Sequence, residues 1–286
     1  MHQPSSDSPI GVFDSGVGGL SVLLELRREL PHENFIYLAD TGNAPYGERG
    51  DEFVKQRTLA IAQHLQNEHQ IKALVVACNT ATTAAVEELR KAFPELPVIG
   101  VEPALKPAAS SSQTHRVGVI ATRGTVKSAR FEQLRQAFSE DTEFRVQACD
   151  GLVKAIERNV EEPASGGEAA EEIKALCARY LGAMGEFGLR TGDIDTLVLG
   201  CTHYVFIKDE IRQLLGPDVH IIDTGAPVAR QTRRILDKRN ALASEDAASG
   251  KEGTVRLYTT GGLPALQAAA RRWMNLAPEY CSALPV

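Results

Sequence analysis

Short apolar runs alternate with longer amphipathic segments along most of the chain. The runs have the length and continuity of buried parallel strands, and the segments between them have the spacing of helices. We expect strands at 10–13, 35–38, 73–77, 97–101, 116–121, 144–148, 196–199, 219–222 and 255–259. We expect helices at 20–30, 52–68, 80–93, 125–138, 168–187, 227–240 and 263–275, and a short one that includes Glu157. Strands that alternate with helices predict an α/β fold with mainly parallel sheets.

The pattern runs twice along the chain. Residues 10–16 read IGVFDSG and residues 117–124 read VGVIATRG, and each round later reaches an apolar run that ends at a cysteine. We therefore predict two similar three-layer lobes, with the active site in the cleft between them. The strands after Cys201 could complete the first lobe or extend the second. Polar stretches at 159–167 and 241–253 are predicted loops, and residues 1–9 a loose tail.

Composition narrows the class of protein. Of 286 residues, 43% are hydrophobic, which is enough for two cores, and the formal net charge of −6 argues against a nucleic-acid partner. The cysteines at 78, 149, 177, 201 and 281 are odd in number and form no Cys-x-x-Cys pair, as is typical of reduced thiols. Residues 1–9 resemble no signal peptide, and no apolar run is long enough to span a bilayer. We expect a soluble cytoplasmic protein.

Two of these cysteines stand where ligands bind in α/β proteins. Cys78 ends the run LVVAC and Cys201 ends LVLGC, so each is predicted at the carboxyl end of a strand, where a helix begins. An ordinary thiol has a pKa of about 8.5, and a helix N-terminus can lower it. Two such groups on opposite faces of one carbon could remove a proton on one side and deliver one on the other. The two cysteines therefore predict an enzyme that inverts the configuration at that carbon.

Polar residues beside the two cysteines suit an amino-acid ligand. Asn79, Thr80, Thr202 and Thr125 offer neutral donors for a carboxylate. Asp14 could bind an ammonium group or orient a thiol, and it could also cap the helix that follows. His203, two residues after Cys201, could orient that thiol.

Four motifs in this order resemble the glutamate racemase family: Asp14-Ser-Gly-x-Gly-Gly, Pro45-Tyr-Gly, Cys78-Asn-Thr-Ala-Thr and Cys201-Thr-His-Tyr. The resemblance covers residues 10 to about 260. It implies cofactor-independent interconversion of L- and D-glutamate, which supplies D-glutamate for peptidoglycan, with Cys78 and Cys201 as the catalytic bases. It implies substrate contacts at Asp14, Ser15, Tyr46, Gly47, Asn79, Thr80, Thr202 and His203. Thr125 and Glu157 are candidate supporting residues.

The resemblance also implies the domain organisation and the partners. Residues 10–103 and 216–286 would form lobe one, which carries Asp14 and Cys78, and residues 104–215 would form lobe two, which carries Cys201. The implied partner is glutamate, with no metal, cofactor, nucleic acid or membrane, and a homodimer is a candidate assembly.

Other functions are weighed against this one. The loop Gly16–Gly19 could hold a dinucleotide with Asp40 on its ribose, but the third glycine of that fingerprint falls at Ser21. Zinc bound by Cys78, Cys201 and His203 matches no standard spacing. A related thiol racemase for aspartate would use the same cysteines, and a non-catalytic amino-acid binding protein would leave both thiols without a purpose. For Cys149, Cys177 and Cys281 we expect a structural role.

Overall fold

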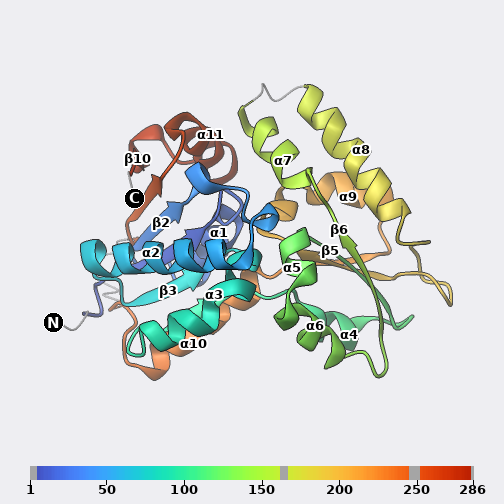
Figure 1. Cartoon of the computed structure of the whole chain (residues 1–286), viewed down its shortest axis with the longest axis horizontal. Coiled ribbons are helices and arrows are strands. Elements are labelled where there is room, and N and C mark those ends of the chain that lie inside the picture. Colours follow the sequence, from blue (N-terminus) through green and yellow to red (C-terminus); the bar gives the residue numbers. More distant parts are fainter. Residues whose placement is uncertain (1–4, 162–166, 245–251, 285–286) are drawn as a thin grey trace. The chain divides into compact units, whose positions relative to one another are not determined.

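The chain folds into two compact units. The computed structural model describes residues 5–161, 167–244 and 252–284. The first unit comprises the chain up to Val101 and again from Gly225, and the second comprises Glu102–Thr224 (Figure 1). None of the described helices is both long and apolar enough to cross a membrane.

A six-stranded sheet forms the centre of the first unit. Its strand order is β10-β9-β2-β1-β3-β4, and all of these neighbours pair in parallel. The strands are β1 (Ile10–Asp14), β2 (Phe35–Ala39), β3 (Ala73–Val76), β4 (Val98–Gly100), β9 (Val255–Thr259) and β10 (Cys281–Ala283). Every residue of β1, β2 and β3 is buried, as expected for strands that are covered on both faces.

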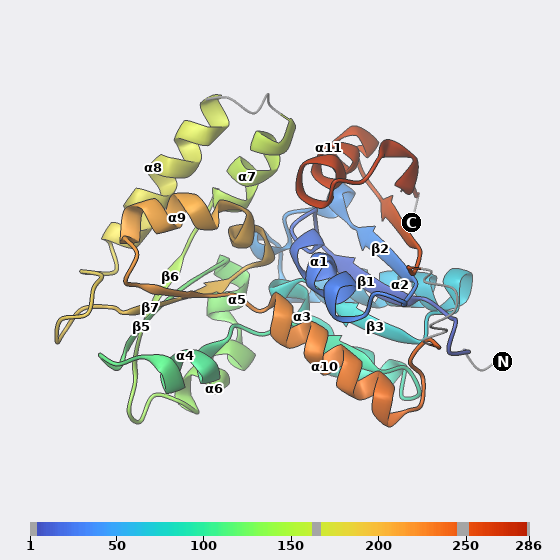
Figure 2. The ribbon, with the colours of Figure 1, turned by 180° about the vertical axis from the view of Figure 1, so that it is seen from behind.

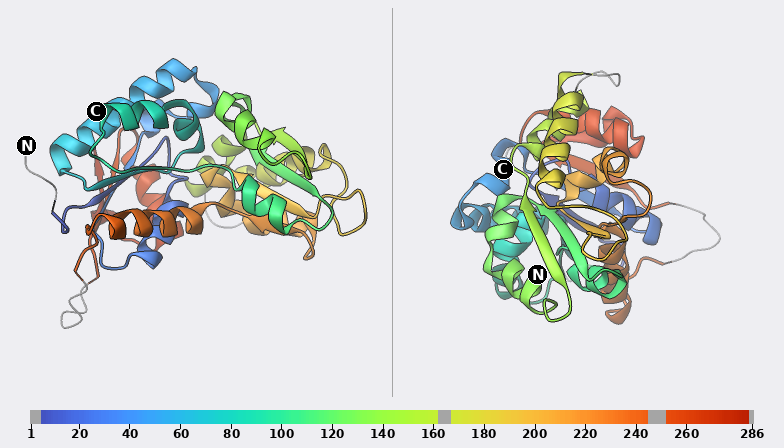
Figure 3. Two further views of the ribbon diagram at one scale, coloured as in Figure 1. Left: turned by 90° about the horizontal axis from the view of Figure 1, so that it is seen from below. Right: turned by 90° about the vertical axis from the view of Figure 1, so that its right-hand side faces the viewer.

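Helices cover both faces of this sheet. On one face α1 (Leu20–Glu29) packs against α10 (Gly225–Lys238) and α11 (Leu263–Met274), and Figure 2 views the sheet from that side. On the other face lie α2 (Asp51–His69) and α3 (Asn79–Ala92), opposite α10 in the left view of Figure 3. Ile61 and Leu65 of α2 join Leu74 and Val76 of β3 in one apolar cluster. The short 3-10 helices are η1 (Thr41–Asn43), η2 (Tyr46–Glu48) and η4 (Pro278–Tyr280).

The second unit has a four-stranded parallel sheet. The order is β6-β5-β7-β8, with bounds β5 (Arg116–Ala121), β6 (Glu143–Ala148), β7 (Thr196–Gly200) and β8 (His220–Ile222). On one side lie α4 (Leu105–Ser111), α5 (Arg123–Lys127) and α6 (Ala129–Gln136). On the other lie α7 (Leu152–Glu161), α8 (Glu168–Gly182) and α9 (Lys208–Leu215), after the 3-10 helix η3 (Thr202–Ile207). Two mostly parallel sheets with helices confirm the predicted α/β class.

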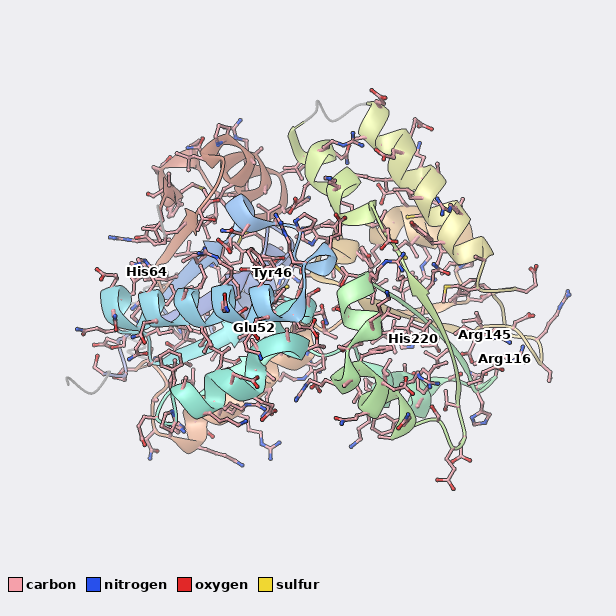
Figure 4. The ribbon with its side chains drawn as sticks, viewed as in Figure 1. Tyr46, Glu52, His64, Arg116, Arg145 and His220 are labelled. Atoms are coloured by element: carbon pink, nitrogen blue, oxygen red, sulfur yellow. The ribbon has the colours of Figure 1, made fainter. Side chains whose placement is uncertain are left out.

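Ion pairs hold the amino-terminal ends of several strands. In the second unit Glu143 pairs with Arg116 at 2.9 Å and with Arg145 at 2.6 Å, and the two arginines lie close together in Figure 4. In the first unit the Lys72 Nζ lies 2.5 Å from the Glu33 Oε2, and both side chains are almost fully buried, at 2% and 3% exposure.

Residues 5–9 are held more firmly than we predicted when we assigned residues 1–9 to a loose tail. Residues 1–4 lie outside the described residues, but 5–9 are hydrogen-bonded to the first unit. The Lys72 Nζ donates to the Ser6 carbonyl, the Asn34 side chain donates to the Asp7 carbonyl at 3.1 Å, and the Lys72 N–H donates to the Pro9 carbonyl at 2.9 Å.

Several element bounds differ from the sequence-based expectations. The helix expected at 125–138 is two helices, α5 and α6, because the Ser128 side chain caps α6 by accepting from the Phe131 N–H. The helix expected at 168–187 ends at Gly182. Residues 216–224, which we assigned to lobe one, lie in the second unit because β8 pairs with β7. Of the two predicted loops, residues 162–166 and 245–251 lie outside the described residues.

Candidate active site

The carboxyl ends of β1, β2 and β3 bring most of the predicted residues of the first unit to one edge of its sheet. These strands are neighbours in the order β2-β1-β3. Asp14 ends β1 and Ser15 follows it, Cys78 follows β3, and Tyr46 and Gly47 lie in η2 after β2. Apart from the half-buried Gly47, these residues are buried.

Cys78 caps the amino-terminal end of α3. Its Sγ accepts the Ala81 N–H at 3.4 Å and donates to the Ser15 Oγ at 3.5 Å. Asn79 and Thr80 form the first turn of α3 and are 3% and 5% exposed, and the Asn79 Oδ1 is buried without a hydrogen-bond partner among the described residues. Burial and the nearby Asp14 charge raise the pKa of the Cys78 thiol, although hydrogen bonds from Ala81 and Ser15 act in the opposite direction. The expected lowering by the helix N-terminus is therefore outweighed, and the resting group is a thiol.

Asp14 lies against the glycine loop that precedes α1. Its Oδ2 accepts the Gly19 N–H at 2.6 Å. A Cβ at position 19 would lie 2.7 Å from the Asp14 Cβ and 3.1 Å from the Ala77 Cβ, so close packing requires glycine here. Because the Gly19 N–H is already used by Asp14, it is not available to a dinucleotide phosphate. The loop is thus explained by the packing of Asp14.

Tyr46 is placed at this edge by its ring and by its hydroxyl group. The ring centroid lies 6.1 Å from that of Phe13 and 6.3 Å from that of Phe53, and the side chain is only 1% exposed. The hydroxyl donates to the Asp40 Oδ2 at 2.6 Å. Figure 4 shows Tyr46 near the amino-terminal end of α2. The phenol is therefore engaged within the protein.

In the second unit a cysteine, a histidine and a glutamate form a hydrogen-bonded chain. Cys201 follows β7 and precedes η3, and its Sγ lies 3.8 Å from the His203 Nδ1. The His203 Nε2 lies 2.9 Å from an oxygen of Glu157, which α7 contributes. His203 is 3% exposed, so a carboxylate orients a buried imidazole against a thiol.

The charge state of His203 follows from this chain. Burial alone would lower its pKa, but the hydrogen bonds and charges of Cys201 and Glu157 outweigh burial and raise the pKa well above its ordinary value. A protonated imidazole beside a thiol favours the thiolate form of that thiol. The raised pKa of His203 thus places a cationic imidazole 3.8 Å from the Cys201 Sγ.

The remaining predicted residues of this unit lie at the same sheet edge. Thr125 is fully buried after β5, and its N–H donates to the Thr122 Oγ1 at 3.4 Å. Thr202 follows Cys201 directly and is 5% exposed. Cys149, Cys177 and Cys281 are buried free thiols, and the structural role that we expected for them stays a prediction. Within the part of the chain that the structure describes, no three His, Cys, Asp or Glu side chains are grouped to hold a metal ion.

Sequence reasoning missed one buried carboxylate in the first unit. Asp40, which we weighed only as a dinucleotide ligand, accepts hydrogen bonds from Tyr46, Asn43, Arg57 and Thr260. The available signal was its position directly after β2, at the same edge as Asp14 and Cys78.

Comparisons with known proteins agree on one family. The Asp/Glu/hydantoin racemase family model matches residues 18–232. The chain is 47% identical over 254 residues to a glutamate racemase of Stutzerimonas stutzeri, covering 89% of each. It is similar to the crystal structure of a glutamate racemase isoform from Bacillus anthracis, with a TM-score of 0.80, 33% identity and full coverage of both chains. Escherichia coli glutamate racemase, solved with L-glutamate and the activator UDP-MurNAc-Ala, gives a TM-score of 0.78 at 31% identity, covering 98% of each chain.

Proposed function

This chain belongs to the Asp/Glu/hydantoin racemase family and is an amino-acid racemase, and we propose that it interconverts L-glutamate and D-glutamate without a cofactor. The observation that carries the proposal is that each unit places one buried thiol at the carboxyl end of a central parallel strand, among polar side chains. Its relatives are named glutamate racemases, and one was solved with L-glutamate bound. We further propose a cytoplasmic enzyme that supplies D-glutamate for peptidoglycan.

In the proposed reaction, the two cysteines act on opposite faces of the α-carbon. One, as thiolate, takes the α-proton, and the other, as thiol, donates its own proton to the far face of the resulting carbanion. The Cα–H bond breaks with its electrons left on carbon, and a new Cα–H bond forms from the S–H. Each turnover exchanges the roles of the two sulfurs, so the reverse reaction uses the same groups.

The neighbouring side chains fit the other groups of glutamate. The buried Asn79 Oδ1 can accept a hydrogen bond from the substrate ammonium group, which would supply its missing partner. Asp14 adds negative charge for the same group. Ser15, Thr80 and Thr202 offer hydroxyl donors for the carboxylates, and the backbone of Tyr46 and Gly47 completes the set, because the Tyr46 phenol is bound to Asp40.

The proposal is tested with purified protein and no added cofactor. L-glutamate is incubated in D2O, and circular dichroism is followed together with deuterium at the α-carbon. We expect the optical signal to decay to zero with full α-deuteration. Exchange without loss of chirality would mean that only one face is served and would contradict the two-base assignment. Racemisation of aspartate but not of glutamate would show that aspartate is the substrate.

Glu157 is expected to act through His203. In Glu157→Gln the imidazole loses its charged partner, so its pKa falls toward the ordinary value and it becomes neutral at lower pH. We expect kcat at pH 8 to fall about tenfold, since a charged hydrogen bond contributes about 1.5 kcal/mol, and KM to change little. The alkaline limb of the pH–rate profile should shift to lower pH, because activity that depends on protonated His203 is lost as pH rises through its pKa.

A matched control for this variant lies on the next helix. Glu171→Gln also removes a carboxylate, which pairs with Lys174 on the exposed surface of α8. Its pH–rate profile should overlie that of the wild type. An unchanged profile in Glu157→Gln would show that His203 does not depend on this carboxylate.

A further inference from the structure

One carboxylate in the first unit is surrounded by donors. Asp40 is fully buried, and its Oδ1 accepts from the Arg57 Nη2 at 2.8 Å, the Thr260 hydroxyl at 2.7 Å and the Asn43 amide at 3.0 Å. Its Oδ2 accepts from the Tyr46 hydroxyl at 2.6 Å and from the Arg57 Nε at 3.1 Å. Charge-assisted and two-pronged hydrogen bonds of this kind are the strong ones.

These donors keep Asp40 ionised. Burial alone would raise its pKa, but the hydrogen bonds from Arg57, Tyr46, Thr260 and Asn43 outweigh burial and lower it. Arg57 is the only cation among them. An ionised carboxylate accepts on both oxygens, so it can bind the Tyr46 phenol while it also binds the other donors.

The network connects three parts of the first unit. Asp40 follows β2, Arg57 lies in α2, and Thr260 follows β9. Two more hydrogen bonds join the segment after β2 to the end of β9. The Gly42 N–H donates to the Thr260 Oγ1 at 3.1 Å, and the hydroxyls of Thr41 and Thr259 lie 2.6 Å apart. The segment 41–49 that carries Tyr46 and Gly47 is thus fixed from β2, β9 and α2.

We propose that Asp40 and Arg57 are positioning residues that hold the Tyr46 phenol and thereby fix the Tyr46–Gly47 backbone where it contacts the substrate. The contact between the Tyr46–Gly47 backbone and the substrate rests on the proposed function. Arg57 acts at one remove, because it binds Asp40 and Asp40 binds the phenol. A fixed segment needs no ordering when the substrate binds, so the pair should affect binding more than the proton-transfer step.

The test compares two variants of Arg57 with a control on the same helix. In Arg57→Gln the Asp40 carboxylate loses its charged partner, and in Arg57→Lys the charge remains while the two-pronged geometry is lost. Lys55→Gln is the control, because it also removes a cation from α2, one whose partner is the exposed Glu52. KM and kcat are measured for both enantiomers, and amide hydrogen exchange is measured for the peptide spanning 41–49.

We expect Arg57→Gln to raise KM about tenfold with less than about threefold change in kcat, because the substrate must then order the 41–49 segment as it binds. Exchange in 41–49 should accelerate while exchange in β3 stays as in the wild type. Arg57→Lys should recover part of both effects, and Lys55→Gln should show neither. Unchanged exchange in 41–49, or a loss of kcat alone, would overturn the inference.

A second variant covers the case in which Arg57→Gln does not fold. Tyr46→Phe removes only the hydroxyl that Asp40 accepts, and it should accelerate exchange in the same peptide and raise KM. Hydrogen exchange needs no turnover, so it shows whether the Asp40–Arg57 pair fixes the segment 41–49 even in a protein without activity. A wild-type protein that did not racemise glutamate would overturn the proposed function, and the exchange result would still decide whether the pair fixes the segment.

Discussion

Replacing either Cys78 or Cys201 with alanine is expected to lower glutamate racemisation by about a thousandfold or more, because positioned proton transfer contributes about 10²- to 10⁴-fold to a rate. Each alanine variant keeps one thiol and can therefore serve only one face of the α-carbon. Circular dichroism should show no interconversion from either enantiomer. In D2O, each variant should exchange the α-proton of at most one enantiomer, and this assigns each cysteine to its substrate.

Two buried thiols that are not among the predicted site residues are matched controls for this prediction. Cys281 lies in the first unit and Cys177 in the second, at 7% and 2% exposure, close to the 5% and 7% of Cys78 and Cys201. Cys281→Ala and Cys177→Ala should retain activity within about threefold of the wild type, since neither removes a proton-transfer group. A Cys78→Ala or Cys201→Ala protein that interconverted the enantiomers at near wild-type rate would exclude the two-base mechanism.

Lys72→Met is expected to lower the free energy of unfolding of the first unit by about 3–5 kcal/mol, the typical effect of breaking a buried ion pair. The Lys72 Nζ lies 2.5 Å from the Glu33 Oε2 and also donates to the Ser6 carbonyl. Without it, a carboxylate at 3% exposure loses its counter-charge. Urea unfolding followed by fluorescence measures this, because the chain's one tryptophan, Trp273, lies in α11 of the first unit.

A second substitution separates the charge effect from simple packing. Lys72→Met/Glu33→Gln removes both charges and keeps an oxygen for the Ala243 N–H, which donates to Glu33 at 2.9 Å. This double variant should regain most of the lost stability, since no unpaired charge remains buried. Lys174→Met, which breaks an exposed pair with Glu171, should cost less than about 1 kcal/mol. A double variant as unstable as Lys72→Met would indicate that packing, not charge, is responsible.

Continuous apolar runs predicted the central strands well, whereas α4, α9 and β10 were missed. The runs at β1, β2 and β3 are buried on both faces, which leaves a strong signal in the sequence. In contrast, α4 contains Pro107 and ends in Ser110 and Ser111, and β10 is a three-residue edge strand. Helix α9 was missed because the apolar run in η3 directly precedes it. Such elements depend on tertiary packing more than on local pattern.

The candidate site also contains residues that the sequence could place and residues that it could not. Cys78 and Cys201 could be placed from sequence because each directly follows a buried strand, and strand ends are where helices and ligand sites begin. The partners of Asp40 could not, because Arg57 and Thr260 are separated from it by 17 and 220 positions and no local spacing relates them. The raised pKa of Cys78 was also unpredictable, since burial and the Asp14 charge arise only in the folded unit.

The order in which the ribosome makes the chain has a consequence for the first unit. Residues 102–224 emerge as one uninterrupted piece, whereas β9, which pairs with β2, is translated only after all of them. Until then β2 can pair only with β1, and its other edge stays open. An open apolar strand edge of this kind can pair with other chains and cause aggregation. Asp40 also lacks the Thr260 hydroxyl at that stage. Release of a truncated chain before β9 would therefore leave the second unit able to fold and the first exposed to chaperones and proteases.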